Sequence, residues 1–350
     1  MNKKILAIMI SALIMTSCGN PAVTGEAKTA APQVMGQENS PKENDPKENI
    51  DLDLKPNEAG KIMVLMYHNI GKEEKEWVRT PANFLKDLTV LYEKGYRPIS
   101  LQDYVTGRIT TEQGFTPVVI TFDDGNLNNF EYLENGFISK ECAVGLLLDF
   151  HEKHQDFPLE ATFFITGGQP FKQRGLESKK LSFIIDNGMD IGNHTSNHPS
   201  FKNAAEDKIQ EEIGAQAQLL QGIINRDDYE INTLALPFGE RPGDKTLTNY
   251  LAFGSYQGLP YKNIAVLNVG WNPGYSPYDS RFDYLNIPRI RASEMKVDNV
   301  GLYDYLAYFD KHPEERFISD GVEGIITIPE NKLELLGTFR EKEIYTYDTK

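Results

Sequence analysis

Hydrophobic positions along the chain follow two alternating patterns. Short apolar runs typical of buried strands occupy 61–68, 117–122, 161–166, 189–194, 233–238, 263–269 and 284–290. Segments with helical spacing of apolar residues lie between them, at 81–95, 140–154, 176–188 and 204–224. In the last segment apolar residues repeat at intervals of three or four, at Ile209, Ile213, Ala217 and Leu220, which predicts a helix with one buried face.

Repeated strand and helix units of this kind predict a parallel sheet. About seven units without an intervening linker predict an α/β fold of the irregular (β/α)7-type barrel class, with a single catalytic domain over 61–350. Three of the strands end in polar or turn-forming sequences, namely "ITFDDG", "IGNHTSNHPS" and "LALPFGE". Because strand ends converge at one mouth of such a barrel, we expect these three sequences to form one site.

The chain before residue 61 differs in composition from the predicted domain. Residues 1–18 contain two lysines and an apolar stretch too short to span a bilayer, which predicts a signal peptide. "MTSC" resembles the lipobox of bacterial lipoproteins, which implies cleavage before Cys18 and lipidation of its thiol; an ordinary secretory signal is the alternative. Residues 19–60 lack aromatic side chains and repeat Pro, Asn, Glu and Lys, so we expect a disordered tether.

Charge excludes one class of partner, and cysteine content indicates how the fold is stabilised. The 350 residues carry a formal net charge of -15, which argues against a nucleic-acid partner because phosphate backbones attract surplus Lys and Arg. The second cysteine of the chain, Cys142, lies in a helix-like segment and is interpreted as a buried apolar filler. A domain of this size can be stabilised by its own core without disulfides.

Candidate catalytic residues lie at two of the strand ends. Asp123 and Asp124 follow the strand 117–122, and the Asn-rich sequence after them lacks the second strand that a simple hairpin turn would require. His194 and His198 are close enough in sequence to bind one metal ion. Two imidazoles and one carboxylate leave a position for water, as in catalytic zinc sites, and the other aspartate would act as a base. Residue chemistry leaves open which aspartate has which role.

These motifs, "TFDDG" and "HTSNHP", resemble those of the polysaccharide deacetylases, carbohydrate esterase family four, also called the NodB homology domain. The resemblance extends over about 62–330 and implies a barrel of about seven β/α units. It also implies that Asp123 is the catalytic base and that Asp124, His194 and His198 bind a divalent metal, most simply Zn²⁺ with Co²⁺ or Ni²⁺ as alternatives. "VLMYHNI", "IPRIRAS" and "RFISDG" look like exported, lipid-anchored members of the family.

The third motif of the family departs from its usual form. It reads Arg-x-Pro-aromatic-Gly elsewhere, but here Ala235 replaces the arginine that orients the base. This sequence keeps the rest of the motif, Pro237, Phe238 and Gly239, which the resemblance assigns to substrate binding. We hypothesise that Arg289 or Arg291 supplies the missing charge from a later strand.

A C-terminal histidine that protonates the leaving amine in many family members is also missing. His68 ends the first predicted strand and is a candidate for this acid, or else a hydrogen-bonded core histidine. Trp271 lies in an aromatic-rich loop after a later strand, where it would either stack on sugar rings or cap the core.

The predicted function is metal-dependent hydrolysis of the acetamide of N-acetylated amino sugars, which releases acetate. The expected substrate is a cell-surface or extracellular polysaccharide of the peptidoglycan or poly-N-acetylglucosamine type. We expect an exported lipoprotein that faces outside the cytoplasm and is held at the membrane through a lipid anchor on Cys18. The alternative is a catalytically impaired, carbohydrate-binding surface lipoprotein, suggested by the missing arginine and histidine.

Overall fold

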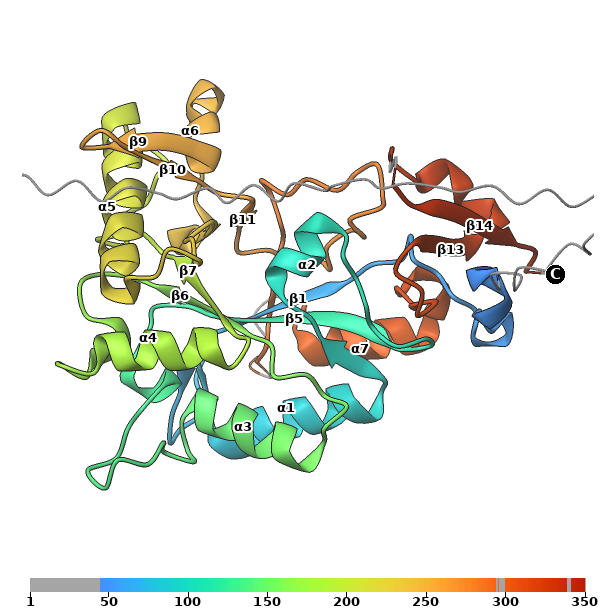
Figure 1. Cartoon of the computed structure of the whole chain (residues 1–350), viewed down its shortest axis with the longest axis horizontal. Coiled ribbons are helices and arrows are strands. Elements are labelled where there is room, and N and C mark those ends of the chain that lie inside the picture. Colours follow the sequence, from blue (N-terminus) through green and yellow to red (C-terminus); the bar gives the residue numbers. More distant parts are fainter. Residues whose placement is uncertain (1–44, 294, 296–299, 339–340, 350) are drawn as a thin grey trace, which may run out of the picture. The chain divides into compact units, whose positions relative to one another are not determined.

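The residues described by the computed structural model, 45–293, 295, 300–338 and 341–349, place eight parallel strands in one curled sheet (Figure 1). The strand order is β11-β8-β7-β6-β5-β1-β12, and β4 pairs with β5 beside this path. The bounds of the strands are β1 Met63–Tyr67, β4 Tyr96–Pro98, β5 Thr116–Phe122, β6 Thr162–Ile165, β7 Asp190–Asn193, β8 Thr233–Ala235, β11 Ala265–Leu267 and β12 Ile290–Arg291.

The segment 287–291 joins the two edges of this sheet. Ile287 pairs in parallel with Leu267 of β11, and the Asn268 N–H donates to the Ile287 carbonyl at 2.9 Å. Further along the same segment, Ile290 pairs in parallel with Leu65 of β1. The sheet therefore curls into an irregular barrel, and the predicted fold class is confirmed.

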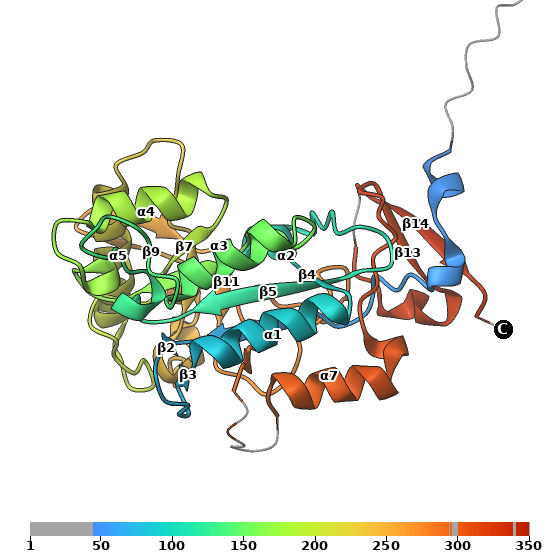
Figure 2. The ribbon, with the colours of Figure 1, turned by 90° about the horizontal axis from the view of Figure 1, so that it is seen from below.

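Helices cover the outer face of the barrel. Their bounds are α1 Pro81–Glu93, α2 Leu101–Thr106, α3 Ala143–Lys153, α4 Glu177–Asp186, α5 Glu206–Ile224, α6 Asn249–Ala252 and α7 Leu302–Lys311. Figure 2 shows α1 and α3 running alongside β5, where Leu88 and Leu147 belong to one core cluster with Ile120. Thr80 caps α1 by accepting a hydrogen bond from the Asn83 N–H at 3.2 Å. The four predicted helices are confirmed as α1, α3, α4 and α5.

Strand alternation decides which side chains face the interior of the barrel. Ile120 of β5 packs in the outer cluster beneath the helices, whereas Val119 belongs to the inner cluster together with Val64 of β1. Successive side chains of a strand point to opposite faces, so the inner series of β5 continues to Asp123 and that of β1 continues to His68. Both chemically active groups thus arrive at the carboxyl end of the barrel on its inner side.

Three small two-stranded sheets were not predicted. They are formed by β2 Asn69–Ile70 with β3 Val78–Arg79, β9 Phe253–Tyr256 with β10 Leu259–Lys262, and β13 Ile325–Pro329 with β14 Glu343–Tyr347. Figure 1 shows β9 and β10 beside α5 at one end of the folded unit, and β13 and β14 at the other end.

The folded unit begins at Asp45, before the predicted boundary at residue 61. Asn57 pairs with Ile318, and the side chain of Glu58 is buried. The expected tether is therefore too long at its C-terminal end. These residues contact the last third of the chain, and such contacts cannot be read from composition. The predicted signal peptide, Cys18 and the tether up to residue 44 lie outside the described residues.

Among the helices that the structure describes, none combines the length and the apolar character needed to cross a membrane. Cys142 is a free, buried thiol at the start of α3, where its Sγ accepts a hydrogen bond from the Gly145 N–H. Its prediction as a buried filler is confirmed, and it also caps the helix.

Candidate active site

A left-handed turn separates the two neighbouring carboxylates at the end of β5. The Asp123 N–H still donates to the Tyr67 carbonyl of β1 at 2.9 Å, so Asp123 continues the strand. Asp124 and Gly125 then have φ values of 74° and 62°. A Cβ at Gly125 would lie 2.6 Å from the Ile165 side chain, which explains the glycine. The two carboxylates consequently leave the chain in different directions.

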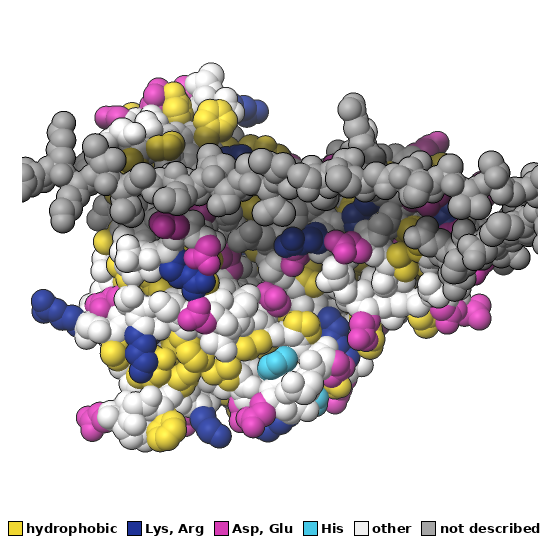
Figure 3. Space-filling view, in the orientation of Figure 1, with side chains coloured by type: hydrophobic (Ala, Val, Ile, Leu, Met, Phe, Trp, Pro, Cys, Tyr) yellow, Lys and Arg dark blue, Asp and Glu magenta, His cyan; other side chains and the backbone are white. Residues whose placement is uncertain are grey.

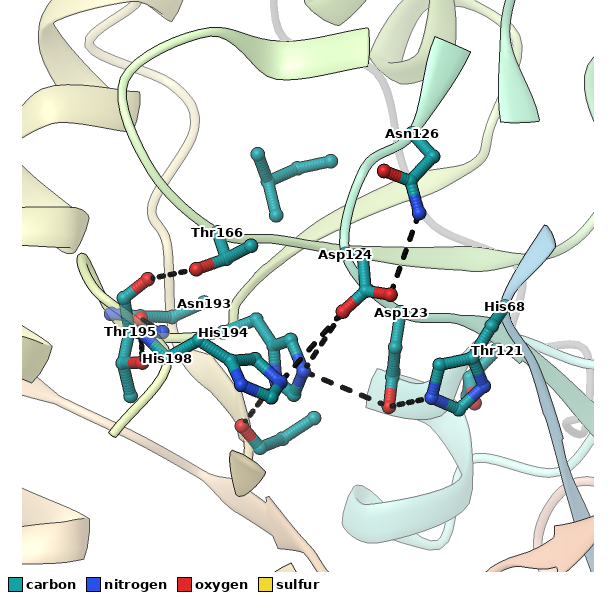
Figure 4. A network of polar contacts seen from close by, with 12 residues as sticks. His68, Thr121, Asp123, Asp124, Asn126, Thr166, Asn193, His194, Thr195 and His198 are labelled. Carbon is teal, nitrogen blue, oxygen red and sulfur yellow. Dashed lines mark hydrogen bonds and ion pairs between the residues drawn. The ribbon is translucent and has the colours of Figure 1, made fainter. Parts of the chain in front are cut away.

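Asp124, His194 and His198 bring their ligand atoms together at the barrel mouth (Figure 4). These atoms lie within 4.8 Å of one another, and Nε2 of His194 and of His198 are 3.7 and 3.8 Å from Asp124 Oδ1. His194 Nδ1 lies 2.8 Å from the Ala235 carbonyl, which can only accept, so Nδ1 carries the proton and the Nε2 lone pair faces Asp124. Burial lowers the pKa of His194, which favours the neutral, metal-binding form. This donor set and its tautomer fit a divalent metal such as Zn²⁺.

The loop that carries the two histidines has a strained backbone. Thr195 and His198 both adopt positive φ values, 66° and 53°. The Thr195 N–H donates to Asn193 Oδ1 at 2.8 Å, and the His198 N–H donates to Thr195 Oγ1 at 3.1 Å. These bonds hold the loop in a conformation that turns both imidazoles toward Asp124.

Glu212 of α5 supports the same loop and was missed from the sequence. Its buried carboxylate accepts from the Ser196 hydroxyl and the Asn197 N–H, both at 2.8 Å, and pairs with Lys208 at 2.8 Å. The available signal was its position: Glu212 lies on the same predicted apolar face as Ile209, where a carboxylate needs partners.

Asp123 and Arg289 form a buried, bidentate ion pair. Both guanidinium terminal nitrogens of Arg289 lie 2.7 Å from the two Asp123 oxygens, and Arg289 Nε donates to the Asn268 carbonyl at 2.9 Å. Burial alone would raise the pKa of Asp123, but the Arg289 charge, with His194 and His68, lowers it well below its usual range. Asp123 is therefore an ionised carboxylate held in one orientation. Of the two arginines in our hypothesis, Arg289 contacts Asp123.

Arg291 contacts the rim of the site instead of the aspartate. It pairs with Glu76 at 2.9 Å, and its guanidinium carbon lies 5.2 Å from the centre of the Trp77 ring. Trp77 in turn lies beside His68, with 4.7 Å between the ring centres. His68 Nε2 is 3.9 Å from Asp123 Oδ2, and burial lowers the pKa of His68 although the Asp123 charge opposes this. Trp77 was not predicted as a site residue.

A pocket of about 390 Å³ opens over these groups. It is lined by His68, Trp77, Asp123, Asp124, His194, His198, Leu236, Phe238 and Val269. The Phe238 side chain is 64% exposed and packs edge-on against His198, with 4.7 Å between ring centres.

The other residues assigned to substrate binding lie outside this lining. Pro237 is buried, and Gly239 has a φ of 67° with its backbone against Val269. Trp271 is 51% exposed, but it does not line the pocket in the described part of the chain. The loop after β11 turns back to pair Gly274 with Ile62 at the start of β1, and the assignment of Trp271 to substrate binding stays a prediction.

Comparison with known proteins is consistent with this site. Residues 111–256, which carry both aspartates and both histidines, match the family model of the polysaccharide deacetylases. This part of the chain is therefore similar to a polysaccharide deacetylase domain, and the resemblance drawn from the sequence motifs is confirmed. Arg289 and His68 lie outside the matched segment.

Individual relatives are distant. An uncharacterised protein of Geobacillus stearothermophilus is 28% identical over 168 residues, which are 45% of this chain and about half, 52%, of the relative. A Streptococcus pyogenes deacetylase in complex with acetate has a TM-score of 0.50 at 20% identity, covering 71% of this chain and 97% of its own. A polysaccharide deacetylase of Bacillus cereus has a TM-score of 0.51 at 17% identity, covering 71% and 68%. These structural likenesses establish the fold.

Proposed function

We propose that the protein is a metal-dependent deacetylase that hydrolyses the acetamide of N-acetylated amino sugars in a polysaccharide. The observation that carries this proposal is the convergence of Asp124, His194 and His198 beside the Asp123–Arg289 pair. A pure binding protein has no need for three metal-ligand atoms next to an oriented carboxylate. The arginine missing from the third motif, which favoured the impaired alternative, has a functional equivalent in Arg289.

Asp123 is the proposed general base. A divalent metal bound by Asp124, His194 and His198 would act as a Lewis acid and increase the acidity of water at the site. Asp123 accepts the proton of the attacking water, and Arg289 fixes the carboxylate so that one oxygen faces the pocket. The ion pair keeps Asp123 ionised at neutral pH, so the carboxylate is in the form that a base requires.

His68 is the proposed acid for the leaving amine. Nε2 of His68 faces the pocket 3.9 Å from Asp123 Oδ2, so a proton taken up by the carboxylate can pass to the imidazole through a short movement or one water. Protonation of the amide nitrogen lets the C–N bond break, giving acetate and a free amino sugar.

A cell-surface polymer, peptidoglycan or poly-N-acetylglucosamine, is the proposed substrate. The support is the lipobox-like sequence ending in Cys18, which would hold the protein on the membrane outside the cytoplasm. A lipid-anchored enzyme acts most readily on polymers at the same surface.

The proposal is tested by acetate release from N-acetylglucosamine oligomers and from peptidoglycan, with Zn²⁺ or Co²⁺ added and with a chelator as control. Asp123→Asn and His194→Ala should each abolish release, and the chelator should abolish it reversibly. Metal binding at one equivalent without acetate release from any acetylated glycan would contradict the proposal and favour the carbohydrate-binding alternative.

A further inference from the structure

Trp77 is an aromatic side chain in the pocket to which neither the motifs nor the proposed chemistry assigns a role. It lies between β2 and β3, is 39% exposed and lines the pocket beside His68. A tryptophan that stabilises a core is normally more deeply buried than this. Exposure of an indole in a pocket that is also lined by carboxylates and imidazoles indicates a surface for a ligand.

The loop that carries Trp77 is held firmly in place. The Trp77 carbonyl accepts a hydrogen bond from the Asn69 N–H at 3.1 Å. Glu74 pairs with Arg79 at 2.6 Å and also accepts from the Thr80 N–H at the start of α1. Arg79 Nε also donates a hydrogen bond to the carboxylate of Asp87, which is buried in α1. The indole is therefore presented to the pocket by a supported backbone, which lowers the entropy lost when a ligand binds.

A second set of contacts fixes the ring relative to the barrel. Arg291 of β12 places its guanidinium carbon 5.2 Å from the centre of the Trp77 ring while it pairs with the neighbouring Glu76. The His68 ring lies 4.7 Å from the Trp77 ring. Trp77 is thus held between Arg291 of β12 and His68, which directly follows β1.

We infer that Trp77 stacks on the pyranose ring that carries the reacting N-acetyl group, and so determines specificity for glycan substrates. This inference rests on the proposed function. The amide nitrogen must come within hydrogen-bonding distance of His68, so the sugar carbon that bears it lies next to His68. Trp77 is the aromatic surface adjacent to that position, whereas Phe238 packs against His198 on the metal-ligand side. The C–H groups of a pyranose face suit the face of an indole.

The chain contains two tryptophans, Trp77 and Trp271, which allows a direct test by fluorescence. The full chain with Trp271→Phe retains Trp77 alone, and the matched Trp77→Phe chain retains Trp271 alone. Addition of the β-1,4-linked N-acetylglucosamine hexamer should change the emission of the Trp271→Phe protein in a saturable manner and leave that of the Trp77→Phe protein unchanged. Unchanged emission from the Trp271→Phe protein, or an equal response from both proteins, overturns the inference whether or not acetate is released.

Kinetics separate sugar stacking from support of His68. Trp77→Ala should raise KM for the hexamer about tenfold and change kcat little, and Trp77→Phe should restore most of the loss. A fall in kcat with KM unchanged would show that Trp77 acts by positioning His68, which also overturns the inference. A retained fluorescence response in a protein that releases no acetate would reject the proposed activity but keep the Trp77 contact.

Discussion

The Asp123–Arg289 pair places a guanidinium from a late segment of the chain against the carboxylate that we propose as the base. Ala235, which occupies the position of the family arginine, contributes only its carbonyl, which fixes the tautomer of His194. The guanidinium that contacts Asp123 comes from Arg289, in the segment 287–291. The sequence could not decide between Arg289 and Arg291, because they are two residues apart and share one face of a strand. The register of β12 against β1 distinguishes the two arginines, since it places Arg289 inside the barrel and Arg291 at the rim.

Arg289→Lys should lower acetate release roughly 100-fold, because an ammonium cannot hold both oxygens of Asp123 and the base loses its fixed orientation. The matched variant is Arg108→Lys, which changes an exposed arginine that pairs with Asp103 and does not line the pocket. We expect it to remain near the wild-type rate, as surface ion pairs contribute little. Steady-state rates of acetate release from the same oligomer measure both effects. Equal losses of rate in the two variants would contradict the role of Arg289.

Elements with long, regular patterns were predictable, and short ones were not. The run over 61–68 predicts β1, and the apolar spacing of 204–224 predicts α5 almost to its ends. In contrast, β4 has three residues and the hairpin of β9 and β10 shows no clean alternation, so their pairing depends on tertiary contacts. The two aspartates and two histidines could be found from motifs, whereas Trp77 and Glu212 belong to no motif, and their place at the site depends on tertiary contacts.

The support that α5 gives to the histidine loop leads to a prediction at this scale. Glu212→Ala should weaken Co²⁺ binding by about 10- to 100-fold, because the loop between His194 and His198 loses the carboxylate that holds Ser196 and Asn197. Glu211→Ala is the control, since Glu211 is exposed and pairs with Lys208 on the surface of the same helix. Titration followed by the visible absorbance of bound Co²⁺ measures both affinities. Similar affinities in the two variants would show that the loop keeps its conformation without Glu212.

At the scale of the whole folded unit, residues 45–62 connect the start of the barrel to the last third of the chain. Asn57 Nδ2 donates to the carbonyls of Glu314 and Arg316 at 3.0 and 2.7 Å, and the Glu58 N–H donates to the Thr327 carbonyl at 3.1 Å. These bonds link the entry to β1 with β13, at the end of the unit opposite α5. The segment that composition marks as a tether is thus in part a structural element.

A protein that begins at residue 59 should therefore unfold about 5–10 °C below one that begins at residue 45. It loses the bonds of Asn57 and Glu58, and their partner carbonyls near Arg316 and Thr327 are left without donors. The active site lies at the carboxyl ends of the strands, away from this contact, so acetate release at 25 °C should be equal in the two proteins. Calorimetry of both measures the difference. Equal unfolding temperatures would mean that residues 45–58 only cover the surface of an already stable barrel, and that the predicted boundary at residue 61 describes the stable domain.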